Sequence, residues 1–276
     1  MIADMLLPSV LMPLVIMLIA AAASLRLSWA PAVGVLVAIF VTFGWIQGFR
    51  FGHLLNPTAM DGLWMMTLVA VVAACLGRWR GAAILLLGLP ISVWAVWVFA
   101  SSISPLEWLG QVLALLVPVA LFAYGTNSQV DRSESGEFWM LGFLIAPVAV
   151  LAPTVGLSGS IKLALIAGAF GTVMALCWWL PWGLSFIAGW QPSRLWNRLV
   201  STLTLPLMWV ALSAYLLVEV PVLALLVAAL PWLIGSLFRA RLAASPWWLQ
   251  LAVLVLVTAL PLVFSLWYVW PEPSMY

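Results

Sequence analysis

Long apolar runs separated by short polar breaks dominate the chain. Dividing it at the charged and Gly-, Pro- and Ser-rich breaks gives ten runs, near residues 6–25, 30–49, 58–77, 81–100, 107–124, 138–153, 161–182, 198–218, 221–238 and 247–270. A helix needs about 20 apolar residues to cross a hydrocarbon core of about 30 Å. The runs lack the alternation of barrel strands, and a helix satisfies its own backbone inside lipid. The pattern predicts an all-α, polytopic membrane bundle of about ten helices (8–10) in one transmembrane domain.

Composition supports the same class of protein. Of the 276 residues, 66% are apolar and only 7% are charged, whereas about 25% of the residues in a soluble domain are charged. Too few polar side chains exist to coat a surface in water, which excludes a soluble enzyme and a disordered chain. The net charge of +2 is spread thinly and favours no nucleic-acid partner. Membrane lipids are the expected partners, with other membrane subunits as a second class.

The basic residues predict the orientation, because Lys and Arg in short loops stay on the cytoplasmic side. With the N-terminus outside, the outer loops carry only Arg50 and Lys162, and the inner loops carry Arg26, Arg78, Arg80, Arg132, Arg194, Arg198, Arg239 and Arg241. An N-out and C-out chain is therefore expected. The first run has Asp4 before it and Arg26 after it, the reverse of a signal peptide, so it is expected to be a retained helix. The lack of hydrophilic domains fits a bacterial inner membrane.

Prolines interrupt several predicted spans, namely Pro13, Pro90, Pro118, Pro147, Pro206, Pro231 and Pro261. Each removes a backbone donor, and neighbouring helices must satisfy the freed carbonyl. Kinked helices are common around transport sites, although membrane helices carry more proline in any case. On the seventh span, Ala164, Gly168 and Thr172 recur at every fourth position, which predicts a face of small side chains and a close helix contact.

The scarcity of reactive side chains limits the chemistry. His53 is the only histidine, so two histidines cannot ligate a haem, and no later histidine can activate a serine in Gly156–Gly159. The chain has no His-Glu-x-x-His pattern and no phosphate-binding glycine loop. Cys75 and Cys177 both lie in apolar runs and are expected to be buried thiols rather than a disulfide. No cofactor, metal site or catalytic residue is predicted.

Two sets of polar or aromatic residues are candidate sites. The first is an outer-face polar cluster that consists of Arg50, His53, Asp61, Glu107, Lys162 and Glu219. This cluster would mark the mouth of a pathway or a docking surface, unless its members only anchor lipid headgroups. The second lies in the basic and aromatic segment Gly189–Arg198 and contains Trp190, Arg194, Trp196 and Arg198. That segment suits an amphipathic helix on an anionic leaflet, or a short helix that docks on a soluble partner.

Three functions from different classes remain open. The first is a transport protein or permease subunit for a small or largely apolar solute, which is favoured by the number of spans and the kinked helices. The second is a non-catalytic membrane subunit or assembly scaffold of a larger complex, which would co-purify with partners at fixed stoichiometry. The third is a lipid- or polyprenyl-modifying enzyme, for which only Asp61 and His53 offer an acid–base pair. Alanine at both positions without loss of function would end the third hypothesis.

Overall fold

The structure is a computed structural model of the whole chain. It describes residues 6–48, 60–96, 136–188, 194–238 and 244–270, together with positions 104, 106, 107, 109, 110, 113, 241 and 242. Throughout this described part, the regular elements are helices and none is a strand. The predicted all-α fold is therefore confirmed for these residues.

The N-terminal half contains two pairs of helices. A π-helical turn leads straight into the first long helix, and a turn of 3-10 helix joins the second pair. The bounds are η1 Leu7–Leu11, α2 Met12–Ser24, α3 Ala30–Gln47, α4 Asp61–Leu76, η3 Gly77–Trp79 and α5 Arg80–Val96. Pro31 lies in the first turn of α3, where the backbone N–H groups have no partner within the helix, so the N–H that proline lacks is not needed. Gly48, with a φ of 79°, ends that helix.

The C-terminal half contains two long helices, two interrupted ones and a final long helix. The interruptions fall at Leu203 and at Ala229. The bounds are α7 Gly136–Leu157, α8 Ile161–Ala188, α9 Leu195–Thr202, α10 Thr204–Val218, α11 Val222–Ala228, α12 Leu230–Leu237 and α14 Trp247–Tyr268.

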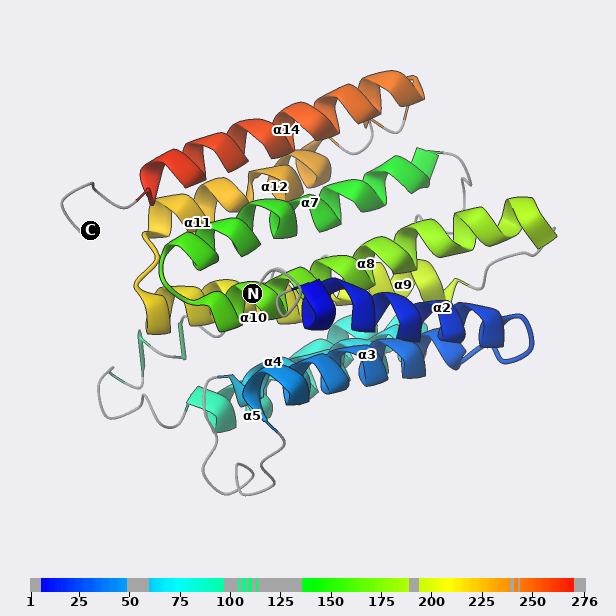
Figure 1. Cartoon of the computed structure of the whole chain (residues 1–276), viewed down its shortest axis with the longest axis horizontal. Helices are drawn as coiled ribbons and strands as arrows, with labels where there is room; N and C mark the ends of the chain where they lie inside the picture. Colours follow the sequence, from blue (N-terminus) through cyan, green and yellow to red (C-terminus); the bar gives the residue numbers. More distant parts are fainter. Residues whose placement is uncertain are drawn as a thin grey trace.

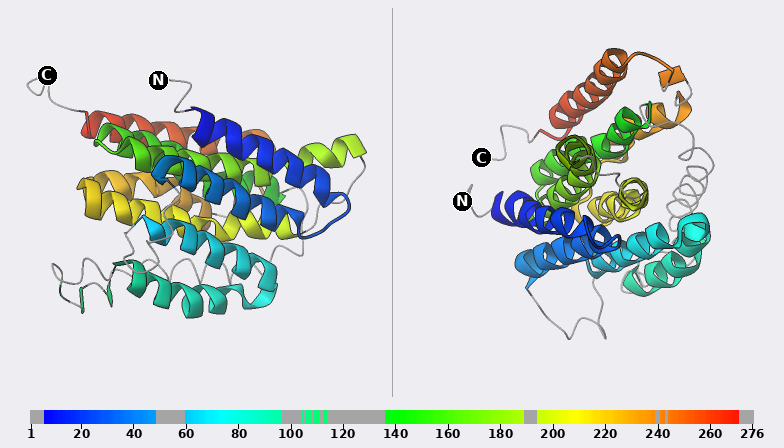
Figure 2. Two further views of the ribbon diagram at one scale, coloured as in Figure 1. Left: turned by 60° about the horizontal axis from the view of Figure 1, so that its bottom comes forward. Right: turned by 90° about the vertical axis from the view of Figure 1, so that its right-hand side faces the viewer.

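The helices run back and forth between two ends of one bundle (Figures 1 and 2). One end, at the right of Figure 1, holds the C-terminal ends of α2, α4, α8 and α12 and the N-terminal ends of α3, α5, α7, α9 and α14. We call it the basic end, because Arg26, Arg78, Arg80, Arg194 and Arg198 belong to these helix ends or to the turns beside them. The opposite end holds the C-terminal ends of α3, α5, α7, α10 and α14.

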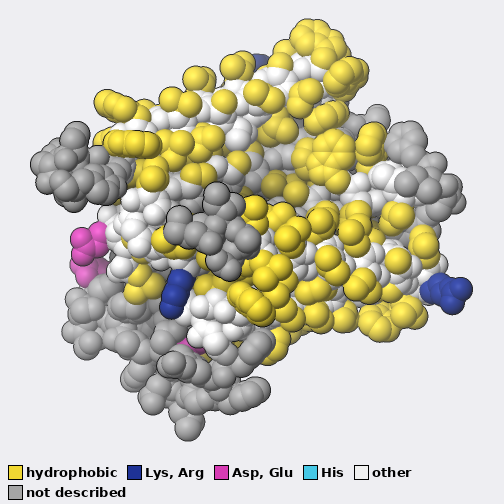
Figure 3. Space-filling model, viewed as in Figure 1, with side chains coloured by type: hydrophobic (Ala, Val, Ile, Leu, Met, Phe, Trp, Pro, Cys, Tyr) yellow, Lys and Arg dark blue, Asp and Glu magenta, His cyan; other side chains and the backbone are white. Residues whose placement is uncertain are grey.

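Within the part of the chain that the structure describes, six helical segments are long and apolar enough to cross a membrane: Leu7–Ser24, Ala30–Gln47, Asp61–Trp94, Ile161–Ser185, Leu195–Val218 and Trp247–Tyr268. The third segment folds back at η3 into α4 and α5, which lie side by side (Figure 2). Apolar side chains also cover much of the outer surface in Figure 3. These are the features of an integral membrane protein.

The described helices coincide with the predicted runs, except for the run at 107–124. That run lies largely outside the described residues, between the end of α5 and the start of α7. The number of about ten spans and the N-out orientation therefore stay predictions.

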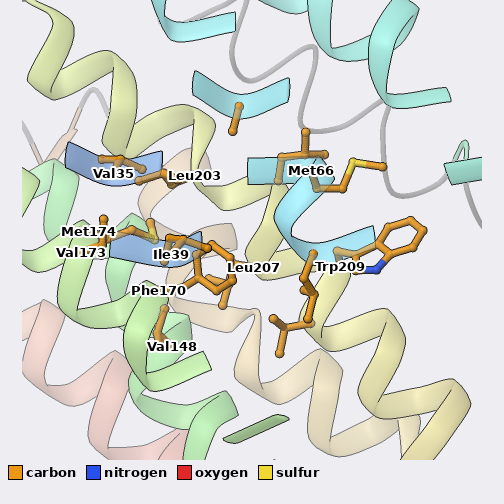
Figure 4. Packing of buried hydrophobic residues seen from close by; sticks show 14 of the residues in the cluster. Val35, Ile39, Met66, Val148, Phe170, Val173, Met174, Leu203, Leu207 and Trp209 are labelled. Carbon is orange, nitrogen blue, oxygen red and sulfur yellow. The ribbon is translucent and has the colours of Figure 1, made fainter. Parts of the chain in front are cut away.

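The middle of the bundle is formed by α9 and α10. In an 18-residue stretch of Leu195–Val218, 72% of the residues are buried, and the two helices pack against α3, α4, α7 and α8. Figure 4 shows this packing, with Ile39 of α3, Phe170 of α8 and Leu207 of α10 in one cluster. Large apolar side chains fill the centre, so that in this conformation the core is packed.

Hydroxyl groups repair the hydrogen bonding where Pro13 disturbs it. Pro13 has no N–H to offer the carbonyls of Ser9 and Pro8, four and five residues earlier. Thr172 Oγ1 of α8 donates to the Ser9 carbonyl at 3.0 Å, and Thr42 Oγ1 of α3 donates to the Pro8 carbonyl at 3.1 Å. Neighbouring helices thus satisfy backbone acceptors for which lipid has no donor.

Glycines bring several helices into close contact. A Cβ added to Gly62 of α4 would meet the Trp209 indole of α10 at 2.6 Å, and one added to Gly235 of α12 would meet Phe143 of α7 at 2.6 Å. A Cβ on Gly168 would lie 3.5 Å from the Cβ of Ser9. The small-residue face predicted on α8 therefore packs closely, as expected, and its neighbour is η1.

Candidate functional site

Three members of the predicted outer-face cluster lie at helix ends. Asp61 begins α4 and is 6% exposed, Lys162 lies in the first turn of α8, and Glu219 follows the last residue of α10. Lys162 and Glu219 are exposed. These helix termini belong to the end of the bundle opposite the basic end (Figure 1). A carboxylate in the first turn of a helix, such as that of Asp61, is favoured by the helix dipole.

The other members of that cluster are less constrained. Glu107 is exposed, and its backbone N–H donates to Ser104 Oγ at 3.3 Å. Arg50 and His53 lie outside the described residues. The structure thus brings Asp61, Lys162 and Glu219 to one end of the bundle, and it does not test the role proposed for the whole set.

The basic and aromatic segment is divided between the surface and the core. Arg194 is exposed just before α9, and Arg198 is partly buried within it. Trp196 is fully buried, so its indole faces neither lipid nor solvent. Trp190 lies outside the described residues. Arg194 and Arg198 are four positions apart on one face of α9, whereas Trp196 lies between them and points to the other face.

Among the described residues, no three His, Cys, Asp or Glu side chains form a group that could hold a metal ion. The more informative feature is apolar. A cavity of about 70 Å³ lies between α7, α10, α11 and α12. Its wall consists of apolar side chains and one hydroxyl: Leu144, Pro147, Leu151, Thr204, Leu207, Met208, Ala211, Leu225, Ala228, Ala229 and Trp232.

The walls of this cavity contain interrupted or proline-bearing helices. Ala229, between α11 and α12, lines the cavity, and Pro231 just beyond it has no N–H for the carbonyl of Val227. Pro147 lies inside α7 and also lines the cavity. Pro206 lies in the first turn of α10, close to the interruption at Leu203. Helix interruptions beside a cavity at membrane depth are typical of transporter binding sites.

The chemistry of the cavity restricts what it can hold. No charged side chain lines it, and the Thr204 hydroxyl is engaged as a donor to the Ser201 carbonyl at 2.7 Å. An ion or a strongly polar solute would lose its hydration there without a replacement. Engineered apolar cavities of about 150 Å³ bind benzene, so a smaller apolar molecule fits this conformation.

A second hollow lies on the outside of the bundle. It has a volume of about 290 Å³ and is lined by Leu36, Val37, Ile39, Phe40, Trp64, Thr67 and Leu68 of α3 and α4. Val37, Phe40 and Leu68 are each at least 40% exposed, so this groove opens on the outer surface. Its walls are uninterrupted helices, in contrast to those of the cavity between α7, α10, α11 and α12.

Comparison of the chain with family models, with curated proteins and with solved structures finds no match.

Sequence reasoning identified the prolines beside the cavity but not the cavity itself. Pro147, Pro206 and Pro231 stand out in the sequence because each interrupts an apolar run. The lining residues Met208, Ala211 and Ala228 are ordinary in such a chain, and only the packing of four helices brings them together. A buried charge was also missed: Arg80 is 1% exposed at the start of α5, although the sequence predicted a loop there.

Proposed function

We propose that this chain is a multi-pass membrane transport protein, or a permease subunit, for a small and largely apolar solute. The observation that carries the proposal is the coincidence of an apolar cavity with the interruption between α11 and α12 and with Pro147 of α7. Interrupted helices supply both a binding surface and a place where the bundle can bend. The solute would bind between α7, α10 and α11.

The test fills the cavity without changing polarity. Ala211→Phe introduces a ring into the cavity wall, and Ala252→Phe places the same ring on an exposed position of α14 as a matched control. Purified protein in liposomes is assayed for uptake of a panel of radiolabelled solutes that are largely apolar and smaller than benzene, such as short alcohols. We expect at least one solute to enter faster than into empty liposomes, with the gain lost in Ala211→Phe and kept in Ala252→Phe. Uptake equal to that of empty liposomes for the whole panel would contradict the proposal.

A second candidate is a non-catalytic membrane subunit of a larger complex. The observation that favours it is α14, in which only 17% of the residues of an 18-residue stretch are buried in this chain. Its exposed side chains are large and apolar, among them Leu260 and Trp267. Co-purification of partners at fixed stoichiometry from mild detergent, together with no solute uptake by the isolated chain, would favour this function over transport.

We also propose that the chain has about ten spans in a bacterial inner membrane, with both termini outside and the basic end in the cytoplasm. The placement of the arginine-bearing turns at one end of the bundle supports this arrangement. In a chain without its native cysteines, Ser28→Cys marks the basic end and Lys162→Cys marks the opposite end. A membrane-impermeant thiol reagent applied to intact cells should label Cys at 162 and not at 28. Equal labelling of both would overturn the orientation.

A further inference from the structure

The turn between α4 and α5 is built around a glycine and an arginine from another helix. Gly77 has a φ of 59°, which L side chains rarely adopt. A Cβ at this position would lie 3.0 Å from Nη1 of Arg198 and 3.3 Å from its Cζ. The Arg198 guanidinium therefore rests on the bare backbone of the turn, and α9, which carries it, packs against α4.

The same turn carries a second guanidinium on its exposed side. Arg78 Cζ lies 5.5 Å from the centre of the Trp79 ring, within the range of a cation–π contact. Arg78 is exposed, and Trp79 is 60% exposed. An exposed indole at the end of a membrane span favours the headgroup region of the bilayer. Arg78 is thus placed at the depth where lipid phosphates lie.

The charges at this turn call for an anion. Arg78 belongs to the turn itself and Arg198 of α9 lies against its backbone, so two positive side chains from different elements border one turn and attract an anion. The acidic side chains described on the adjoining helices are distant. Asp61 begins the helix that Gly77 ends, about 24 Å away at 1.5 Å per residue. Glu219 lies at the far end of α10.

We propose that Arg78, Trp79 and Arg198 form a binding site for the headgroup of an anionic phospholipid. Guanidinium groups match a phosphate in geometry and charge, and the indole packs against the glycerol and upper acyl carbons. This site is separate from the cavity of the proposed function and does not depend on transport. The sequence analysis assigned lipid contact to a set of residues that included Trp196. In the proposed site the indole that contacts lipid is that of Trp79, in the turn between α4 and α5.

The test measures lipid retention by native mass spectrometry of the full chain. Protein in detergent is supplied with phosphatidylglycerol or phosphatidylcholine at equal concentrations. The site variant is Arg78→Gln with Arg198→Gln. The matched control is Arg26→Gln with Arg241→Gln, which removes the same charge from exposed positions outside this turn. We expect preferential retention of phosphatidylglycerol by the unmodified chain, about tenfold weaker in the site variant and nearly unchanged in the control.

Two further variants keep the test decisive. If the double variant fails to fold, Arg78→Gln alone still removes an exposed charge and should weaken phosphatidylglycerol retention about threefold. Arg198→Lys keeps the charge and loses the planar fork, so it should fall between the unmodified chain and the double variant. Equal retention of both lipids by the unmodified chain, or equal losses in the site and control variants, would overturn the proposal. The second outcome would mean that only net charge attracts the lipid.

Discussion

The helix pair α9–α10 and the helix α14 have similar lengths, yet they lie in opposite environments. Over an 18-residue stretch of each, 72% of the residues are buried in Leu195–Val218 and 17% in Trp247–Tyr268, although α14 has the higher mean hydropathy. The inner pair carries buried hydroxyls at Ser201, Thr202, Thr204 and Ser213. The outer helix also buries two polar side chains, Gln250 and Ser265, but it exposes its largest apolar ones.

The difference shows what sorts helices inside a bilayer. Lipid tails are as apolar as leucine, so the hydrophobic effect gives no reason to hide the most apolar helix. Close packing and the satisfaction of polar groups decide the arrangement, and these favour α10 in the centre, where Trp209 rests on Gly62. The consequences for stability can be measured by matched substitutions on the two helices.

The largest expected effect comes from removing an indole. Trp209→Ala on α10 empties a site that is 1% exposed, whereas Trp267→Ala on α14 truncates a side chain that is 73% exposed. We expect the first to lower the free energy of unfolding by about 3 kcal/mol and the second to leave it within about 0.5 kcal/mol. Unfolding by SDS in mixed micelles measures both. Equal losses would remove the distinction between the two helices.

A smaller effect is expected from adding one methyl group at a helix contact. Gly62→Ala drives Cβ into the buried Trp209 ring at 2.6 Å, and Gly142→Ala meets Leu254 of α14 at 2.7 Å and Trp178 at 3.0 Å. We expect Gly62→Ala to cost about 2 kcal/mol. Gly142→Ala should cost less, because the flexible Leu254 tip on a loosely packed helix can move.

Gly183→Ala is the control for these two glycine variants, since a Cβ on Gly183 of α8 meets nothing within 4 Å. It should be neutral or stabilising by up to about 1 kcal/mol through helix propensity. A larger loss for Gly142→Ala than for Gly62→Ala would contradict the packing described for α10.

Hydroxyl groups provide a third contrast. Thr172→Val removes a bond from α8 to the Ser9 carbonyl at 3.0 Å, which the hydroxyl shares with the Gly168 carbonyl of its own helix. Thr258→Val removes only a bond within α14, to the Leu254 carbonyl at 2.7 Å. We expect a loss of about 0.6–1.5 kcal/mol for Thr172→Val. Thr258→Val should have little effect, because the Leu254 carbonyl remains within the backbone hydrogen bonding of α14. The same SDS titration resolves the pair, and a larger loss at Thr258 would count against the role of contacts between helices.

The smallest effect concerns the ends of the two helices. Glu219, which follows α10, has a φ of 55°, whereas Val269, which follows α14, has a φ of −98°. Glycine adopts the first conformation without strain, so Glu219→Gly should raise the free energy of unfolding by about 0.5–1 kcal/mol. Val269→Gly should give no gain. The thermal midpoint in detergent is sufficient to compare them, and a loss for Glu219→Gly would show that its carboxylate has a structural role.

The sequence was sufficient for the helices because apolar length and polar breaks are local properties. The runs at 30–49 and 247–270 match α3 and α14 to within a few residues. Which helix is central depends on contacts between distant segments, such as Gly62 with Trp209, and no local pattern reveals them. The same holds for the cavity and for the turn where Arg198 meets Gly77. The prolines predicted the helix interruptions only in part. Pro231 lies beside an interruption, whereas Pro181 lies within the continuous helix α8.

The most direct test of this arrangement uses the unmodified protein. A membrane-soluble aryl diazirine is photolysed in proteoliposomes, and the carbene adducts are mapped by mass spectrometry. We predict adducts along α14, at side chains such as Leu256, Leu260 and Val263, which are 57%, 67% and 66% exposed. Adducts on α10 should be several times fewer and confined to its C-terminal end, where Tyr215 and Leu217 are exposed, because the rest of the helix packs against α4, α7 and α8. Equal labelling of α10 and α14 would contradict the central position of α10.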